Sequence, residues 1–203
     1  MTKSLVQNLL LMLAMDMPTP HEVLLALHHP VRRRLNEVLL LHGPATVGQL
    51  AERLDLAVGS VSHHLKVLAA ADLVQPAPEL AADGRQSWWR ADPAPMSWSV
   101  ADYSAPIERA TAESAELENA AYEARRVRTW YEQREQYSDE WAQASFATNG
   151  WVIATADELD ELGRRINDLI VEWAARRKPG TGDAAETGAE PAFVFARGFR
   201  AEP

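Results

Sequence analysis

Apolar positions in the first half of the chain repeat with the period of short helices. Over residues 31–42, Leu35, Val38 and Leu39 share one side, Pro30 suits the first turn, and Gly43 is a natural stop. Thr46, with Gln49 three residues later, has the spacing of a capping box. The pattern therefore predicts two short helices, over residues 30–42 and 47–56.

Residues 58–70 predict a third helix with two unlike sides. The apolar side, which we expect in the core, holds Val58, Val61, Leu65 and Leu68, with His64 at its edge. The opposite side holds Gly59, Ser62, His63, Lys66 and Ala70, with Ser60 on the flank. Small residues allow a close approach, and hydroxyls and an imidazole can bind base edges or phosphates. This side could therefore enter a nucleic-acid groove.

The residues that follow Asp72 predict a β-hairpin. Residues 73–80 and 86–91 read as strands around a turn at 81–85, and alternation places Trp88 and Trp89 on opposite faces. Three helices followed by a hairpin that carries Arg85 and Arg90 predict a winged helix-turn-helix.

Three motifs within residues 20–92 carry a family resemblance. They are "HPVRRRLNEVLL", "TVGQLAERLDLAVGSVSHHLKVLAAADLV" and "GRQSWWRADP". With them the chain resembles the arsenic-repressor (ArsR) family of bacterial transcription regulators, and more closely its metal-independent actinobacterial relatives. The resemblance implies a recognition helix and a wing. The DNA-binding candidates are Thr46, Gly59, Ser60, Ser62, His63, Lys66, Arg85 and Arg90.

The chain departs from the family's pattern in its helix caps and in its metal ligands. Ala57 stands where a capping serine is common, and Asp72 stands where glycine is usual, although aspartate tolerates a left-handed backbone. Cysteine is absent and no histidine follows His64, so we expect neither a metal nor a cofactor. Catalytic motifs such as GxSxG, HExxH or a P-loop are absent, so we expect no enzyme activity.

Two polar residues of the first half are interpreted as structural. His64 lies at the rim of an apolar stripe, where a packed and hydrogen-bonded histidine is the preferred interpretation. Arg32 belongs to an arginine triplet that must spread around a helix axis, so it is assigned to the fold rather than to phosphate binding.

The second half predicts a long helical segment over residues 105–147, as one helix or as two with a kink. Its apolar stripe is narrow and rich in alanine, which suits close packing against a partner helix. The dimerisation candidates on this stripe are Ile107, Leu117, Ala121 and Ala124.

The end of the chain predicts one more helix and a small β element. Thr155 and Glu158 form a capping box that opens a helix ending before Pro179. Residues 151–155 and 192–199 read as strands that pair with each other. This half contains four tryptophans that either fill a core or line a pocket for a small apolar effector. They are Trp130, Trp141, Trp151 and Trp173. Core filling is the preferred interpretation.

Charge and composition limit the class of protein. The net charge is −9; residues 18–95 carry 7 Lys/Arg and 8 Asp/Glu, whereas residues 96–178 carry 10 and 16. Only a local basic patch can therefore bind DNA. No window approaches the ~20 apolar residues of a membrane span, and the chain is expected in the cytoplasm.

The fold class expected is mainly α, a winged helix-turn-helix domain followed by a long-helix dimerisation domain with a small β element. The expected parts are an N-terminal helix (1–17), a DNA-binding domain (18–95), a helical dimerisation or effector domain (96–178), and a linker with a strand (179–203). The expected function is a homodimeric repressor that binds double-stranded operator DNA with an inverted repeat. The alternative is a helical protein-interaction scaffold that retains a winged helix without DNA binding.

Overall fold

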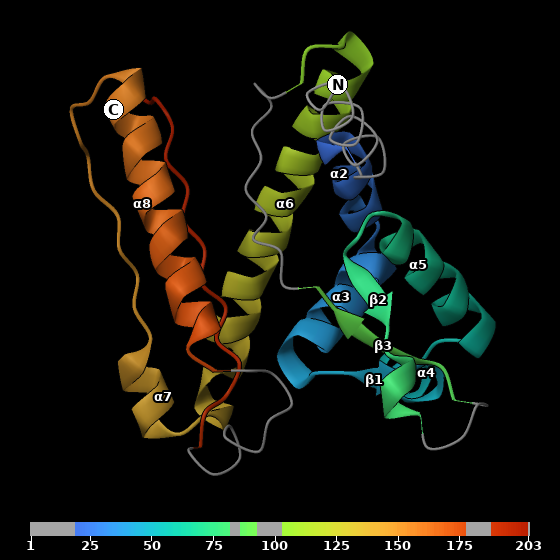
Figure 1. Cartoon of the computed structure of the whole chain (residues 1–203). Coiled ribbons are helices and arrows are strands. Elements are labelled where there is room, and N and C mark those ends of the chain that lie inside the picture. The colour runs from blue at the N-terminus through green and yellow to red at the C-terminus, as the bar shows by residue number, and fades with distance from the viewer. Residues whose placement is uncertain (1–18, 82–85, 93–102, 178–187, 203) are drawn as a thin grey trace, which may run out of the picture. The chain divides into compact units, whose positions relative to one another are not determined.

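The computed structural model describes residues 19–81, 86–92, 103–177 and 188–202 (Figure 1). The predicted helix over 1–17, Arg85 and most of the predicted linker lie outside these residues. The described residues form two compact units, which divide between Ala115 and Glu116, inside one helix.

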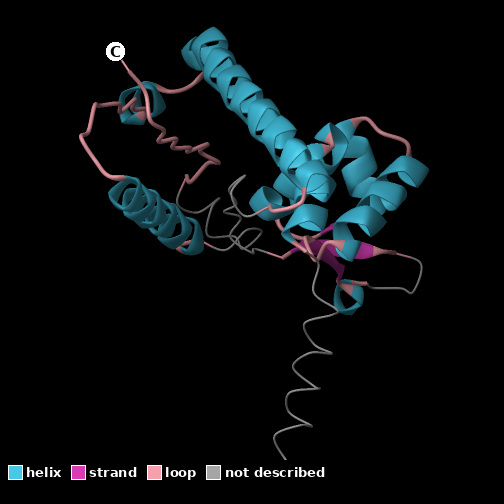
Figure 2. Cartoon of the chain, turned by 90° about the horizontal axis from the view of Figure 1, so that it is seen from above, coloured by secondary structure: helices cyan, strands magenta, loops and turns pink. Residues whose placement is uncertain are grey.

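Most elements of the first unit precede residue 92. They are α2 (Pro20–His28), α3 (Pro30–His42), β1 (Ala45–Thr46), α4 (Val47–Leu54), α5 (Val58–Ala70), β2 (Val74–Pro76), a 3₁₀ helix (Pro78–Leu80) and β3 (Trp88–Ala91). A three-stranded antiparallel sheet joins these helices, as Figure 2 shows in magenta. The described fold is therefore mainly α with a helix-turn-helix and a small sheet, as the sequence predicts.

Helix boundaries in this unit follow from local chemistry. α2 and α4 both begin with complete capping boxes, at Thr19 with Glu22 and at Thr46 with Gln49. α3 begins at Pro30 and ends at His42, and its C-cap Gly43 has a φ of 80°, a conformation that suits glycine. The fully buried leucines and valines of the core are Leu35, Leu39, Leu50, Val61, Leu65, Leu68 and Val74. These residues come from three helices and one strand, so they hold the helix-turn-helix as one body.

The sheet differs from the predicted hairpin in two ways. β3 lies between β2 and β1, and the strand at Ala45–Thr46, which the sequence analysis missed, pairs with Trp88 and Trp89. The predicted strand over 73–80 ends at Pro76, and a 3₁₀ helix follows. Prolines at 76 and 78 have no N–H to donate to a ladder, which accounts for the short strand.

The long helical segment is two α-helices rather than one. α6 (Pro106–Gln133) continues into a 3₁₀ helix (Arg134–Gln136), and α7 (Asp139–Ala144) begins anew at Ser138, whose side chain accepts a hydrogen bond from the Trp141 N–H. The capping serine starts a new helix, which agrees with the alternative of two helices. α8 (Ala156–Ala175) opens with the predicted capping box of Thr155 and Glu158. Among the described helices, none is long and apolar enough to cross a membrane.

The strands predicted at the C-terminal end are wrong. Residues 151–155 and the described residues from 190 onward have no strand. The end segment is held to α6 by side chains instead: the Phe193 ring lies 5.7 Å from the Tyr122 ring, and Arg197 forms an ion pair with Glu123. Side-chain anchors of this kind need no ladder hydrogen bonds, and an apolar alternation alone does not distinguish them from a strand.

Candidate nucleic-acid interface

Helix α5 has a buried side and an exposed side, which is the geometry of a recognition helix. Val61, Leu65 and Leu68 are completely buried. The residues on the other side, where the sequence analysis placed the DNA contacts, are exposed Gly59, His63 and Lys66 and partly buried Ser60 and Ser62. A carbon added at Gly59 would meet no atom within 4 Å, so nothing in the described chain crowds the start of this helix. α5 can therefore lie against a large partner without rearranging the core.

Only Val58 departs from the predicted pattern of α5. It was expected in the core, but 58% of its surface is exposed. Val58 is the first residue of the helix, so its side chain lies before the turn that packs against α3 and α4. The helical stripe begins one turn later than the sequence indicated.

The turn before α5 and the end of α5 are fixed by aspartates in a left-handed backbone. Asp55, at the end of α4, has φ 53°, and Asp72, after α5, has φ 52°. The Leu73 N–H donates to the Leu68 carbonyl at 3.0 Å, closing the helix end in the manner usual for a glycine cap. Asp72 thus performs the role for which the resemblance implies glycine. Ala57 makes no side-chain cap, as expected.

Thr46 stabilises the start of α4 with the groups that a DNA contact would use. Its hydroxyl accepts a hydrogen bond from the Gln49 N–H at 3.2 Å, and its own N–H donates to the Gln49 side chain at 2.8 Å. The structure therefore assigns Thr46 a capping role, and its contact with DNA stays a prediction.

Arg90 of the wing is paired with an acid that no sequence pattern indicates. Its guanidinium donates to Glu79 of the 3₁₀ helix at 2.5 Å, and both side chains are about half exposed, at 43% and 52%. The two residues are eleven apart across an irregular segment, so no periodicity in the sequence could have paired them. Arg90 is thus on the surface, next to a competing negative charge.

Three histidines near α5 have rings in contact with one another, in tilted and edge-on arrangements. His29 and His64 have ring centroids 4.6 Å apart, and His63 lies 5.5 Å from His64. Burial, followed by the charge of His29, lowers the pKa of His64, and burial likewise lowers that of His29. Within the described residues, no group of three histidines or carboxylates could hold a metal ion.

Arg32 is structural, in agreement with the sequence analysis. Its guanidinium donates to the carbonyl oxygens of Ala26 and, at 2.8 Å, of Leu25, near the end of α2. These carbonyls belong to the last turn of a helix, where no backbone N–H remains to satisfy them. Arg32 therefore joins α2 to α3.

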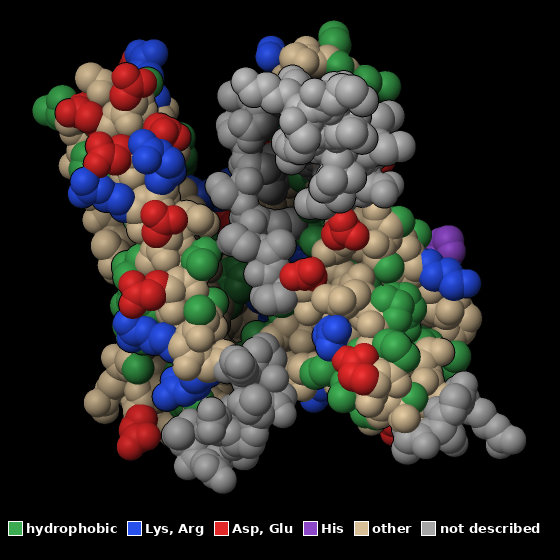
Figure 3. All heavy atoms as spheres, viewed as in Figure 1, with side chains coloured by type: hydrophobic (Ala, Val, Ile, Leu, Met, Phe, Trp, Pro, Cys, Tyr) green, Lys and Arg blue, Asp and Glu red, His purple; other side chains and the backbone are tan. Residues whose placement is uncertain are grey.

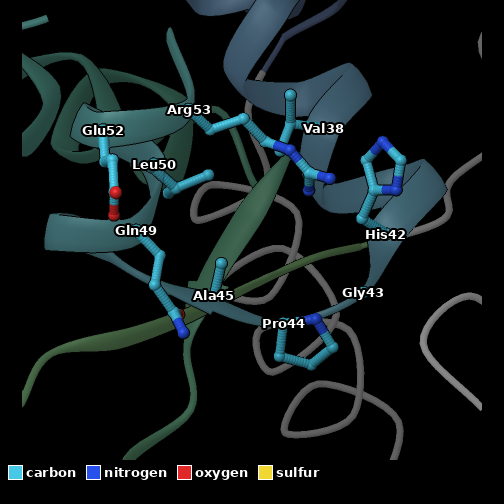
Figure 4. A pocket seen from close by; sticks show the side chains of 9 residues that line it. All are labelled: Val38, His42, Gly43, Pro44, Ala45, Gln49, Leu50, Glu52 and Arg53. Carbon is cyan, nitrogen blue, oxygen red and sulfur yellow. The ribbon is translucent and has the colours of Figure 1, made fainter. Parts of the chain in front are cut away.

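A cavity of about 510 Å³ lies between the end of α3, β1 and α4 (Figure 4). His42, Glu52 and Arg53 contribute polar groups to it, and burial together with the Arg53 charge lowers the pKa of His42. None of the tryptophans proposed for an effector lines this cavity. Trp130 and Trp141 are partly buried and Trp151 and Trp173 are exposed, so the effector pocket stays a prediction.

Helix α6 presents the predicted dimerisation stripe to solvent. Ile107 is 78% exposed, Leu117 is 74% exposed, and Ala121 and Ala124 are also exposed. The stripe continues the 3–4 spacing of a coiled-coil seam, and its exposed members are Ile107, Ala110, Ser114, Leu117, Ala121, Ala124 and Tyr131.

The opposite side of α6 is already occupied by the chain's own residues. Ala112 and Ala115 are buried in a cluster with Leu24 and Tyr103. At 100° per residue, these alanines lie roughly opposite the exposed stripe. Packing among the described residues therefore leaves the stripe exposed.

Comparison with known proteins identifies one domain. A family model described as a helix-turn-helix domain matches residues 27–76, which span α3 to β2. HlyU from Vibrio cholerae, in its reduced form, has 22% identity and a TM-score of 0.31, covering 50% of this chain and 85% of its own. A variant of ZitR from Lactococcus lactis, in apo form, has 17% identity and a TM-score of 0.27, covering 84% of this chain and 93% of its own. Among curated proteins, none matches this chain in sequence.

Proposed function

We propose that this chain, which carries a helix-turn-helix domain of the kind found in DNA-binding transcription regulators, is a sequence-specific repressor that acts as a homodimer in the cytoplasm. The observation that carries the proposal is the division of α5 into a fully buried apolar side and an exposed polar side. An exposed helix of small residues with one cation suits a major groove about 12 Å wide.

The residues of the proposed interface divide into two kinds. Ser60, Ser62 and His63 have short side chains with hydrogen-bonding groups, which suit direct contact with base edges. Lys66, Arg85 and Arg90 supply positive charge, which suits phosphates and carries no sequence information. Gly59 has no side chain, and this permits a close approach of the backbone at the start of α5.

Dimerisation through α6 would complete the DNA-reading surface. The alanine-rich stripe is exposed along the helix, and alanine allows two helix axes to approach closely. Two recognition helices related by a two-fold axis must lie ~34–36 Å apart to meet successive major grooves. The operator expected is therefore an inverted repeat with half-site centres about 10 base pairs apart, or a multiple of that spacing.

The DNA-binding part is tested by salt-dependent binding to the DNA beside the gene. Lys66→Ala should lower the slope of log affinity against log salt by about 1, because one phosphate contact is lost. Ser62→Ala combined with His63→Ala should weaken operator binding more than binding to unrelated DNA. Arg164→Ala, which removes an exposed arginine from α8, is the matched control and should change neither quantity. No binding at low salt would support the scaffold function instead.

Dimerisation through α6 is tested by two substitutions on that helix. Ala121→Glu places a charge in the stripe and should weaken self-association through α6 in sedimentation experiments, with loss of operator binding. Thr129→Glu changes an exposed residue of α6 that lies away from the stripe and should leave the dimer intact. Equal effects of both changes, or none from Ala121→Glu, would reject α6 as the interface.

A further inference from the structure

The second unit has almost no interior of its own. Among its described residues, only Glu123 is buried. Helix α8 has no buried residue. Several large apolar side chains of α8 are exposed instead, including Leu162 at 41%, Leu169 at 53% and Trp173 at 59%. Exposed apolar surface gathered on one side of a helix indicates an interaction surface, because burying it is favourable by roughly 25 cal/mol per Å².

Five apolar residues of α8 are arranged symmetrically about Ile166, whereas Leu169 has Gly163 at its mirror position. Counted from Ile166, apolar residues lie four positions away at Leu162 and Ile170 and seven positions away at Leu159 and Trp173. These spacings keep all five side chains on one side of a helix. A palindromic stripe matches itself when a second, identical helix lies antiparallel across it.

The described residues cover one margin of this stripe and leave the other exposed. The C-terminal segment passes close to Leu159, since a carbon added at Gly198 would lie 3.2 Å from the Leu159 Cδ1 atom. Leu159, Ile166 and Ile170 are accordingly half-buried, whereas Leu162 and Trp173 are exposed. The margin that carries Leu162 and Trp173 is therefore available to a partner.

The charges along α8 favour an antiparallel partner of the same sequence. The first turns hold four acids, Asp157, Glu158, Asp160 and Glu161, and Arg176 and Arg177 directly follow the last helical residue. An antiparallel copy brings its arginines to within a turn of these acids, whereas a parallel copy brings like charges together.

The ion pairs within α8 leave the stripe clear. They join residues four apart on the polar side: Arg164 with Asp160, Arg165 with Glu161, and Arg176 with Glu172. Figure 3 shows acidic and basic side chains interspersed along α8, on the left of that view.

We propose that α8 is a second self-association surface, on which the α8 of another copy of this chain packs antiparallel with Ile166 at the two-fold axis. This surface is separate from the α6 stripe and goes beyond the proposed DNA-binding function. It applies whether the second copy is the α6 partner or belongs to a neighbouring dimer. In either case the apolar side of α8 becomes buried against its own image.

Site-directed cross-linking tests the pairing, and the chain suits it because it contains no cysteine. Ile166→Cys alone should form a disulfide-linked dimer under mild oxidation. Leu162→Cys and Ile170→Cys should link poorly alone but readily when the two proteins are mixed. Asp168→Cys, two residues along on the opposite side of the helix, is the matched control and should not link. No link at Ile166, or a strong link by Leu162→Cys alone, would overturn the antiparallel pairing.

A second measurement separates this surface from the α6 dimer. In full-length protein, Leu162→Glu should weaken self-association at least tenfold in sedimentation experiments. The Ile166→Cys link should persist when Ala121→Glu is added to disrupt the α6 stripe. Loss of the link in that variant would overturn the proposal, because α8 would then have no affinity of its own. Failure of operator binding with an intact link would instead count only against the proposed function.

Discussion

Removing the acid beside Arg90 should strengthen DNA binding. In the free protein Glu79 accepts a hydrogen bond from the Arg90 guanidinium at 2.5 Å, and a phosphate would have to displace it. Glu79→Gln keeps the size of the side chain and removes the charge. Arg90 would then be available to a phosphate without breaking an ion pair.

The size of the gain follows from the exposure of the pair. With side chains 43% and 52% exposed, water screens the interaction, and such pairs contribute about 0.2–1 kcal/mol. Since about 1.4 kcal/mol is a tenfold change in affinity, we expect binding to tighten by roughly 1.4- to fivefold. The gain should be the same for operator and unrelated DNA, because a phosphate contact does not read sequence.

A double-mutant cycle decides whether Glu79 acts through Arg90. Affinities are measured by fluorescence anisotropy at low salt for the single variants, Glu79→Gln and Arg90→Ala, and for the double variant. In the Arg90→Ala background, Glu79→Gln should give a clearly smaller gain. An equal gain in both backgrounds would mean that Glu79 acts only as a general repulsive charge. An unchanged affinity in the wild-type background would refute a role of Arg90 at the DNA.

Three further predictions concern stability. Leu65→Ala should lower the free energy of unfolding by about 2–5 kcal/mol in urea, because this side chain is completely buried, and a value below 1 kcal/mol would contradict its place in the core. Arg197→Ala should cost about 1–3 kcal/mol by leaving the Glu123 carboxylate without its ion pair, and adding Glu123→Gln should restore much of the loss. Because the pKa values of His29 and His64 are lowered in the folded state, the unfolded chain takes up protons first as the pH falls. Thermal stability should therefore decrease below the ordinary histidine pKa near 6.5, and a pH-independent melting temperature between 7 and 5 would contradict this.

The helix-turn-helix could be predicted from the sequence because its determinants are local. Thr46 with Gln49 marks a helix start, and Val61, Leu65 and Leu68 mark a buried side. Each signal lies within a few residues, where helix geometry fixes the spacing.

The elements that the sequence analysis missed depend on contacts between distant residues. β1 is a two-residue strand whose existence requires β3, about 43 residues later. Arg197 and Glu123 are 74 residues apart, and the apolar alternation around Arg197 resembled a strand. Such pairings are decided by tertiary packing, and a short periodic pattern in the sequence carries no information about that packing.

The continuity of α6 has a consequence for how the protein unfolds. Its 28 residues form one backbone ladder about 42 Å long, and the division between the two compact units falls within that ladder. Breaking a helix in its middle creates two new helix ends. The amide and carbonyl groups at these ends lose their hydrogen-bond partners within the helix. The rate of amide hydrogen exchange along α6 should therefore change gradually from Ala112 to Trp130, without a step at Ala115. Unfolding of the second unit would then fray α6 into the first unit.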